Sequence, residues 1–443
     1  MDVAVVSGRQ VLVDGELRPA TLLVEDGRIA EIRPYDADAG GWQAPEASYV
    51  LPGVVDTHVH VNEPGRTEWE GFVTATRAAA LGGVTTLVDM PLNSLPPTTT
   101  VEALELKRAA ATDELAIDVG FWGGAVPDNL GRLAPLWEAG VLGFKCFLAP
   151  SGVDEFPPLD AVQLKAALAE VAALDGLLIV HAEDAGELER APHPPSPAYA
   201  DFVLSRPDAA ETEAIRQLVD GARETGCRVH VLHLASARAL DLIKSARDEG
   251  LPLTVETCPH YLCFAAEQIP DASPQFKCCP PIRDEGNRTA LWQGLTDGLI
   301  DAIVSDHSPA TAEVKLAGGG DLQQAWGGVA GLQVGFTAVA HEARDRGIGI
   351  ADVSRWMSRQ TADLVGFTRK GRIEVGADAD LAVYDPTTEL VVDVDRLAHR
   401  NPISAYDGRT FRGSVTHTTS RGRLLDPDRP DHTWGRMLRR EAP

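Results

Sequence analysis

The chain has 443 residues, of which 44% are hydrophobic and 24% charged, and its formal net charge at pH 7 is −25. This length accommodates one large α/β domain and a smaller one, with the composition of an ordinary globular protein. The negative charge argues against a nucleic-acid partner, which would need a basic face. No apolar stretch is long and uncharged enough to span a bilayer, so we expect no membrane partner.

The first part of the chain is typical of short strands joined by turns. VAVVSGRQVLVDGEL and TLLVEDGRIAEIRP each carry a Ser-Gly or Asp-Gly turn signal between β-rich runs. The pattern returns near the other end in GRIEVGADADLAVYDP and SVTHTTSRGRLL. Because each flank alone is too short for a stable core, we predict one small β-sandwich-like module from residues 1–53 plus 372–443. Two unrelated edge hairpins are the alternative.

Residues 54–371 alternate between apolar strand-like runs and helix-length segments. There are eight such runs, from VLPGVVDTHVH to AIVSDHSP. Several of the segments between them end in glycine, as helix C-termini prefer. This alternation predicts an α/β fold with a TIM-like (β/α)8 barrel. The alternative is a doubly wound open sheet, which gathers its ligand at one crevice. Polar residues at the ends of five runs fit a closed ring better.

Those polar residues are of metal-ligand type: His58, His60, Lys145, His181, His233 and Asp306. His58 and His60 are two residues apart, so both side chains project from the same face of a strand. One strand can therefore supply two imidazoles to one ion. The candidates exceed what a single zinc requires, which favours a two-metal site with ions about 3.5–4 Å apart.

Lys145 lies inside the apolar run VLGFKCF, where a charged lysine is costly. Two dications at short range need a bridging anion, and an ammonium group would repel both. We therefore predict that Lys145 is deprotonated and adds carbon dioxide to become a bridging carbamate. An ordinary paired or snorkelling lysine is the alternative.

His181 and His233 would complete the second metal, with His230 and His260 as weaker candidates. Asp306 follows the eighth run. We predict that it ligates one metal and serves as general base and acid for a metal-bridging hydroxide that attacks a carbonyl, passing the proton to the leaving nitrogen. A turn aspartate before Pro309 is the alternative.

The six cysteines include no CxxC pair, and no basic, apolar leader opens the chain. We interpret them as free thiols in a reducing cytoplasm. Three arginines near the C-terminus, Arg436, Arg439 and Arg440, are predicted to form a solvated tail.

The six ligand-type residues, in this order, resemble the binuclear cyclic amidohydrolases of the amidohydrolase superfamily. The stretches NEPGRTEWEGF, GFKCF, SRPDAAETEAI, ETCPHYL, KCCPPIRD and SDHSPATAEVK resemble the allantoinase branch in particular. The resemblance covers nearly the whole chain and implies a homotetramer. It also implies hydrolysis of the ring amide of (S)-allantoin to allantoate in purine breakdown, with two divalent ions. Zinc is the first expectation, and cobalt, iron, manganese or nickel are alternatives.

Two positions separate this branch from its relatives. Dihydroorotases carry an arginine two residues after the second metal histidine, where this chain has Asn62. Dihydropyrimidinases and hydantoinases carry a tyrosine five residues after the bridging lysine, where this chain has Pro150. Both differences favour allantoin. Ring opening of a dihydropyrimidine or hydantoin, or a non-catalytic interaction protein of the same fold, is the alternative.

Four further residues fall on motifs near the expected pocket mouth: Asn93, Cys279, Ser308 and Trp326. Relatives often carry serine where this chain has Cys279, and in related enzymes the backbone of that residue holds the substrate ring. We expect all four to contact the small-molecule substrate, with capping or packing roles as the alternative.

Overall fold

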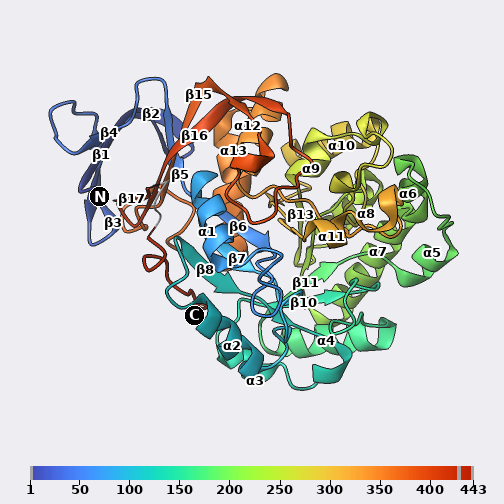
Figure 1. Cartoon of the computed structure of the whole chain (residues 1–443). Helices are drawn as coiled ribbons and strands as arrows, with labels where there is room; N and C mark the ends of the chain where they lie inside the picture. Colours follow the sequence, from blue (N-terminus) through green and yellow to red (C-terminus); the bar gives the residue numbers. More distant parts are fainter. Residues whose placement is uncertain (1–2, 427–430, 441–443) are drawn as a thin grey trace.

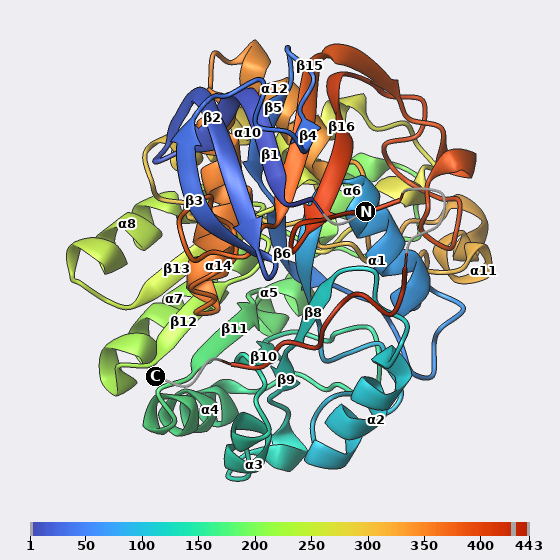
Figure 2. The ribbon, with the colours of Figure 1, turned by 90° about the vertical axis from the view of Figure 1, so that its left-hand side faces the viewer.

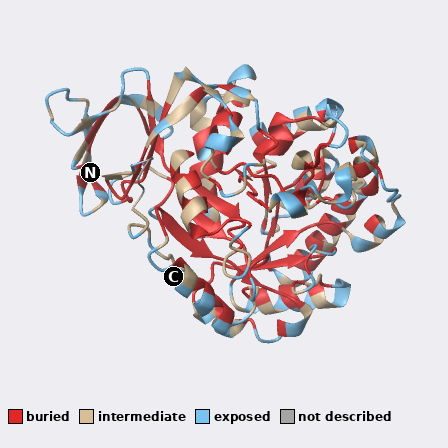
Figure 3. Cartoon of the chain, in the orientation of Figure 1, coloured by how far each residue is buried: buried red, intermediate tan, exposed pale blue. Residues whose placement is uncertain are grey.

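The computed structural model describes residues 3–426 and 431–440 and places a ring of parallel strands at the centre of the molecule (Figure 1). The strands of the ring are β6 (Val54–Val59), β7 (Val84–Asp89), β8 (Asp118–Phe121), β9 (Gly123–Gly124), β10 (Phe144–Phe147), β11 (Leu177–His181), β12 (Arg228–Val231), β13 (Leu253–Thr257) and β14 (Ala302–Ile303). Nearly every residue in them is buried, as expected for parallel strands covered by helices (Figure 3).

The pairing of these strands closes the ring. One ladder runs β6-β7-β8 and a second runs β9-β10-β11-β12-β13-β14. Only Trp122 separates β8 from β9, so these two segments are halves of one strand. The chain beyond β14 returns to β6 through a parallel bridge between His307 and Val59, and the His60 N–H donates to the His307 carbonyl at 2.9 Å. The predicted eight-stranded barrel is thereby confirmed.

Helices cover the outside of the barrel. They are α1 (Phe72–Leu81), α2 (Val101–Ala111), α3 (Ala134–Glu138), α4 (Ala161–Ala173), α5 (Ala185–Arg190), α6 (Tyr199–Ser205), α7 (Asp208–Thr225), α8 (Leu240–Asp248), α9 (Pro259–Cys263), α10 (Glu285–Thr296), α11 (Ala312–Lys315), α12 (Gly335–Asp345), α13 (Ile350–Ser354) and α14 (Gln360–Leu364). Helix α4 begins where the Asp160 carboxylate accepts from two backbone N–H groups, and α7 ends at Gly226 in the left-handed conformation. Among the described helices, none has both the length and the apolar character to cross a membrane.

Strands from both ends of the chain form a second sheet beside the barrel (Figure 2). These strands are β1 (Val5–Val13), β2 (Glu16–Glu25), β3 (Arg28–Pro34), β4 (Trp42–Gln43), β5 (Tyr49–Pro52), β15 (Leu381–Val391), β16 (Thr410–Ser420) and β17 (Arg423–Leu424). They run β17-β16-β15-β5-β1-β2-β3, with β4 also on β1, and β5 pairs with β15 through Val50 opposite Val383. The joint module from both flanks is confirmed as one continuous sheet, while the exact domain limits stay a prediction.

The prediction of a solvated C-terminal tail is confirmed for the side chains of Arg436 and Arg439, which are exposed, but it is wrong for the backbone of this segment. Among the described strands, β8 itself pairs with β7 alone, and pairing with β10 begins at its continuation β9, so backbone groups near the start of β8 need other partners. The Val119 N–H donates to the Arg436 carbonyl at 2.9 Å, and Met437 bridges Val119 in parallel. The Arg440 guanidinium lies 3.8 Å from the Trp137 ring centroid. Thus this segment extends the β8 edge and anchors itself on α3.

Candidate active site

All six ligand-type residues converge at the carboxyl end of the barrel. Lys145 lies on β10 and His181 ends β11, whereas the other four lie at or just after the ends of β6, β12 and β14. None of the six is more than 7% exposed. His233 and Asp306 adopt left-handed backbone conformations with φ of 36° and 43°. Such conformations are uncommon for these residue types and concentrate at functional sites.

The first half of the cluster combines two imidazoles with a carboxylate. His58 Nε2 lies 3.2 Å and His60 Nε2 3.6 Å from the same Asp306 oxygen, Oδ1. The three ligand atoms, one from each residue, all lie within 4.8 Å of one another. Two imidazole nitrogens and one carboxylate oxygen make a donor set that suits a divalent transition metal.

The second half of the cluster lies next to the first. His181 Nδ1 lies 3.0 Å from His233 Nε2, so two ring nitrogens point at the same space. Lys145 Nζ lies 3.4 Å from His58 Nε2. The lysine therefore lies beside the first half of the cluster, while the His58 and His233 rings, with 5.4 Å between centroids, bring the two halves together.

Burial sets the protonation of these groups. It lowers the pKa of Lys145 to about 8 against the attraction of Asp306 and Glu256. It also places the pKa of His60 and His233 well below the ordinary value. The pKa of Asp306 is well below its usual range because His58 and the other imidazoles outweigh the effect of burial. Burial also lowers the pKa of His58, but the attraction of Asp306 and Glu256 outweighs it, so that this pKa is raised. At His60 and His233 the site therefore holds imidazoles that are free to bind metal, beside a carboxylate and a readily deprotonated amine.

A buried glutamate that the sequence reasoning missed orients the first half of the cluster. The His58 Nδ1–H donates to Glu256 Oε1 at 2.6 Å, and His230 Nε2 lies 3.0 Å from the other oxygen. Since Nδ1 of His58 is occupied, Nε2 is left to bind a metal. His230 is thus a partner of Glu256 rather than a ligand. The signal was available: Glu256, like Lys145, is a charged residue inside an apolar strand.

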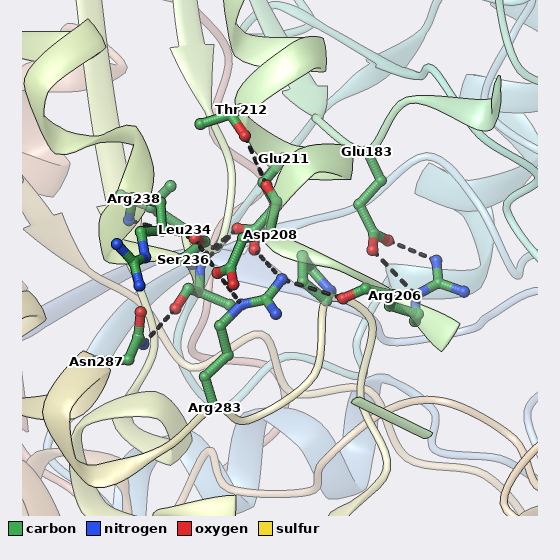
Figure 4. A network of polar contacts seen from close by, with 12 residues as sticks. Glu183, Arg206, Asp208, Glu211, Thr212, Leu234, Ser236, Arg238, Arg283 and Asn287 are labelled. Carbon is green, nitrogen blue, oxygen red and sulfur yellow. Dashed lines mark hydrogen bonds and ion pairs between the residues drawn. The ribbon is translucent and has the colours of Figure 1, made fainter. Parts of the chain in front are cut away.

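A second glutamate orients the other half. His181 Nε2 lies 2.8 Å from Glu183 Oε2, which leaves Nδ1 directed at His233. Arg206 donates from Nε to Glu183 Oε1 at 3.0 Å and from Nη2 to Oε2 at 2.5 Å (Figure 4). Because Glu183 lies two residues after His181, the same-face spacing that united His58 with His60 also predicts this contact.

The loop that carries His233 is held by its own buried acid. Glu211 on α7 accepts from the backbone N–H groups of Ala235 and Ser236 at 2.9 and 3.0 Å. Arg283 donates to the other oxygen of Glu211 at 2.8 Å (Figure 4). This pair joins the loops after β12 and before α10, and it fixes the backbone just beyond His233.

His260, expected at the rim, is buried near Asp306. Its ring packs edge-on against Tyr261, with 4.2 Å between centroids. Neither ring nitrogen contacts a hydrogen-bond partner within the described part of the chain. One ligand atom from each of His260, Cys258 and Asp306 lies within 4.8 Å of the other two. His260 is therefore a further candidate ligand on the Asp306 side.

A cavity of about 390 Å³ opens above the cluster. All four residues predicted to contact substrate line it: Asn93, Cys279, Ser308 and Trp326. Asn93 Nδ2 lies 3.4 Å from His60 Nδ1, and Trp326 packs edge-on against Trp69 with 4.8 Å between centroids. The size suits a small molecule, and substrate contact by these four stays a prediction.

This barrel, with its ligand-type residues at the strand ends, matches a known class of proteins. Residues 49–425 match the amidohydrolase family, and the chain belongs to that family. Among solved structures, L-hydantoinase (dihydropyrimidinase) from Arthrobacter aurescens superposes with a TM-score of 0.93 at 30% identity, covering 99% of this chain and 100% of that one. Dihydropyrimidinase from Brevibacillus agri superposes with a TM-score of 0.89 at 27% identity, covering 98% of each.

Within the family, the chain groups with the allantoinases. It is 53% identical to allantoinase from Streptomyces avermitilis over 441 residues, covering 99% of this chain and 98% of the relative. It is 43% identical to allantoinase from Saccharomyces cerevisiae, covering 96% and 95% of the two chains. The resemblance found in the sequence motifs is thereby confirmed.

Proposed function

We propose that the chain hydrolyses the cyclic amide bond of (S)-allantoin to give allantoate, a step of purine breakdown. The observation that carries the proposal is the near-full-length identity of 53% and 43% to allantoinases. The superposed hydantoinase and dihydropyrimidinase reach only 30% and 27%. Asn62 and Pro150 support the same choice, because they stand where dihydroorotases and hydantoinases carry an arginine and a tyrosine.

The donor set favours two divalent ions, with zinc as the first expectation and cobalt, iron, manganese or nickel as alternatives. The ligands would be His58, His60, His181, His233, Asp306 and the carbamate of Lys145. Such a pair of ions supplies the activation of water and the polarisation of a carbonyl.

The side chains of the cluster supply the remaining chemistry. Asp306 is ionised, so it can accept the proton of the attacking water and return it to the leaving ring nitrogen. The neutral Lys145 amine can attack carbon dioxide, forming the N–C bond of the carbamate with loss of one proton. Glu256 and Glu183 hold His58 and His181 in the tautomers that this arrangement needs.

The close superposition on hydantoinases makes ring opening of hydantoins or dihydropyrimidines the second candidate. One assay separates the candidates: hydrolysis of allantoin, hydantoin, dihydrouracil and dihydroorotate by the purified, metal-loaded protein. We expect the highest kcat/KM for allantoin. Turnover of hydantoin or dihydrouracil without turnover of allantoin would refute the proposal.

We also propose a homotetramer and a cytoplasmic location. The location is supported by the six free cysteines, five of which are buried. Light scattering after gel filtration tests the assembly, and a mass other than four chains would contradict it.

A further inference from the structure

The cavity above the ligand cluster is basic, although the chain as a whole carries a net charge of −25. Among the described residues that line it, Lys145, Arg206 and Lys277 are basic and Asp306 alone is acidic. Lys145 belongs to the ligand cluster. Lys277 donates from Nζ to the backbone carbonyls of Gln323 and Ala325. Arg206 is therefore the cation best able to offer donors to a bound molecule.

The geometry of Arg206 leaves one edge of its guanidinium free. Nε and Nη2 both donate to Glu183, which is fully buried. Within the described part of the chain, no acceptor contacts Nη1, and the Arg206 side chain keeps 18% of its surface exposed. A guanidinium has five N–H donors in one plane. Glu183 thus fixes one edge of the guanidinium (Figure 4). The other edge remains available to the cavity that Arg206 lines.

The position of Arg206 relative to the ligand cluster suggests what this edge recognises. Arg206 contacts Glu183, and Glu183 contacts His181 of the ligand cluster. Two hydrogen bonds in series therefore connect the guanidinium to the cluster. Hydrolysis requires the ring amide of the substrate at the cluster itself. A group that projects from the ring can therefore reach the next polar side chain outward.

We infer that Arg206 binds the exocyclic ureido group of the substrate, with Nη1–H donating to the ureido carbonyl oxygen. This inference rests on the proposed function, because allantoin is a hydantoin ring that bears a ureido arm. Hydrogen bonds from a charged donor are stronger than those between neutral groups. Glu183 keeps the guanidinium in place before the substrate arrives, so little ordering is needed on binding.

The test compares two substrates that differ only in the ureido arm. Arg206→Lys keeps the charge opposite Glu183 but removes the second edge of donors. We expect kcat/KM for allantoin to fall by about 10- to 100-fold. For hydantoin, followed by turnover or by competitive inhibition, the change should stay below about threefold. The metal content should stay that of the wild type. Arg216→Lys, an exposed position on α7, is the matched control and should change neither substrate.

The outcomes separate this inference from the proposed function. Equal losses on both substrates, or loss of metal, would show that Arg206 acts only through Glu183 on His181, and the inference would fall. An unchanged preference for allantoin would also overturn it. If the lysine variant does not fold, Arg206→Gln gives a second comparison of the two substrates, without the positive charge opposite Glu183. Wild-type protein that does not hydrolyse allantoin would overturn the proposed function and this inference together.

Discussion

Replacing Glu256 by glutamine should weaken metal binding at the His58 side of the cluster. Glu256 is 1% exposed and contacts His58 at 2.6 Å and His230 at 3.0 Å. A carboxylate can accept from both imidazoles, whereas a carboxamide has one accepting oxygen and presents an NH2 group to the other ring. One imidazole must then change its tautomer or lose its partner.

The magnitude follows from that lost contact. A hydrogen bond to a charged group contributes about 1.5–3 kcal/mol, and loss of such an outer partner typically lowers metal affinity about 10- to 100-fold. We therefore expect Glu256→Gln to weaken the binding of one zinc per chain by one to two orders of magnitude. The second ion, at His181 and His233, should be affected less.

The assay is metal content after equilibration of wild-type and variant protein against graded free zinc, set with a chelator. Glu224→Gln is the control, because Glu224 pairs with Lys165 on the surface at 53% exposure and contacts no ligand. Wild-type affinity for both ions in Glu256→Gln would refute the reasoning that Glu256 orients His58.

Four further predictions follow from the structure. Lys145→Ala should lose most bound metal and activity, with short carboxylic acids restoring part of both, and full metal occupancy in this variant would rule out the bridging role. Because burial lowers the pKa of Lys145 from 10.5 to about 8, its neutral form grows as pH rises through 8. Metal loading of the apoprotein at fixed dissolved carbon dioxide should therefore rise from pH 6 to 9, and a flat profile would contradict this. Asp306→Asn should lower kcat by about 10²- to 10⁴-fold in steady-state assays while His181 and His233 keep their metal, and near-wild-type turnover would exclude the proton-transfer role. Asp118→Asn should destabilise the fold by about 3–5 kcal/mol in denaturant titrations, because it weakens a buried contact with Lys370 and Arg421, and a change below about 1 kcal/mol would contradict this.

The barrel and its ligand cluster could be predicted because their signals are local. Each ligand type closes or interrupts an apolar run, and parallel strands bring their carboxyl ends to one side of a barrel. Lys145 could be identified because burying a charged lysine inside an apolar strand is costly unless the residue has a specific role. The same rule applied to Glu256, and the two-residue spacing applied to Glu183, would have found the groups that orient His58 and His181.

Other features depended on tertiary packing that no local pattern carries. Arg206 lies between α6 and α7. The first turn of α7 lies beside the segment that follows β11, where the Asp184 N–H donates to the Ala210 carbonyl at 2.9 Å, and this packing brings Arg206 near Glu183.

The backbone pairing of the C-terminal segment escaped prediction for a similar reason. The charge of its arginines correctly predicts exposed side chains at Arg436 and Arg439, but the free backbone edge of β8 around Val119 exists only once the barrel is assembled.

The central claim is that this chain hydrolyses allantoin at a site with two metal ions. The most direct measurement is the rate of allantoin hydrolysis as metal is returned to the metal-free protein, with bound metal counted per chain. We predict negligible activity without metal and a maximum when two ions are bound. Full activity in the metal-free protein, or none at two bound ions per chain, would contradict the account.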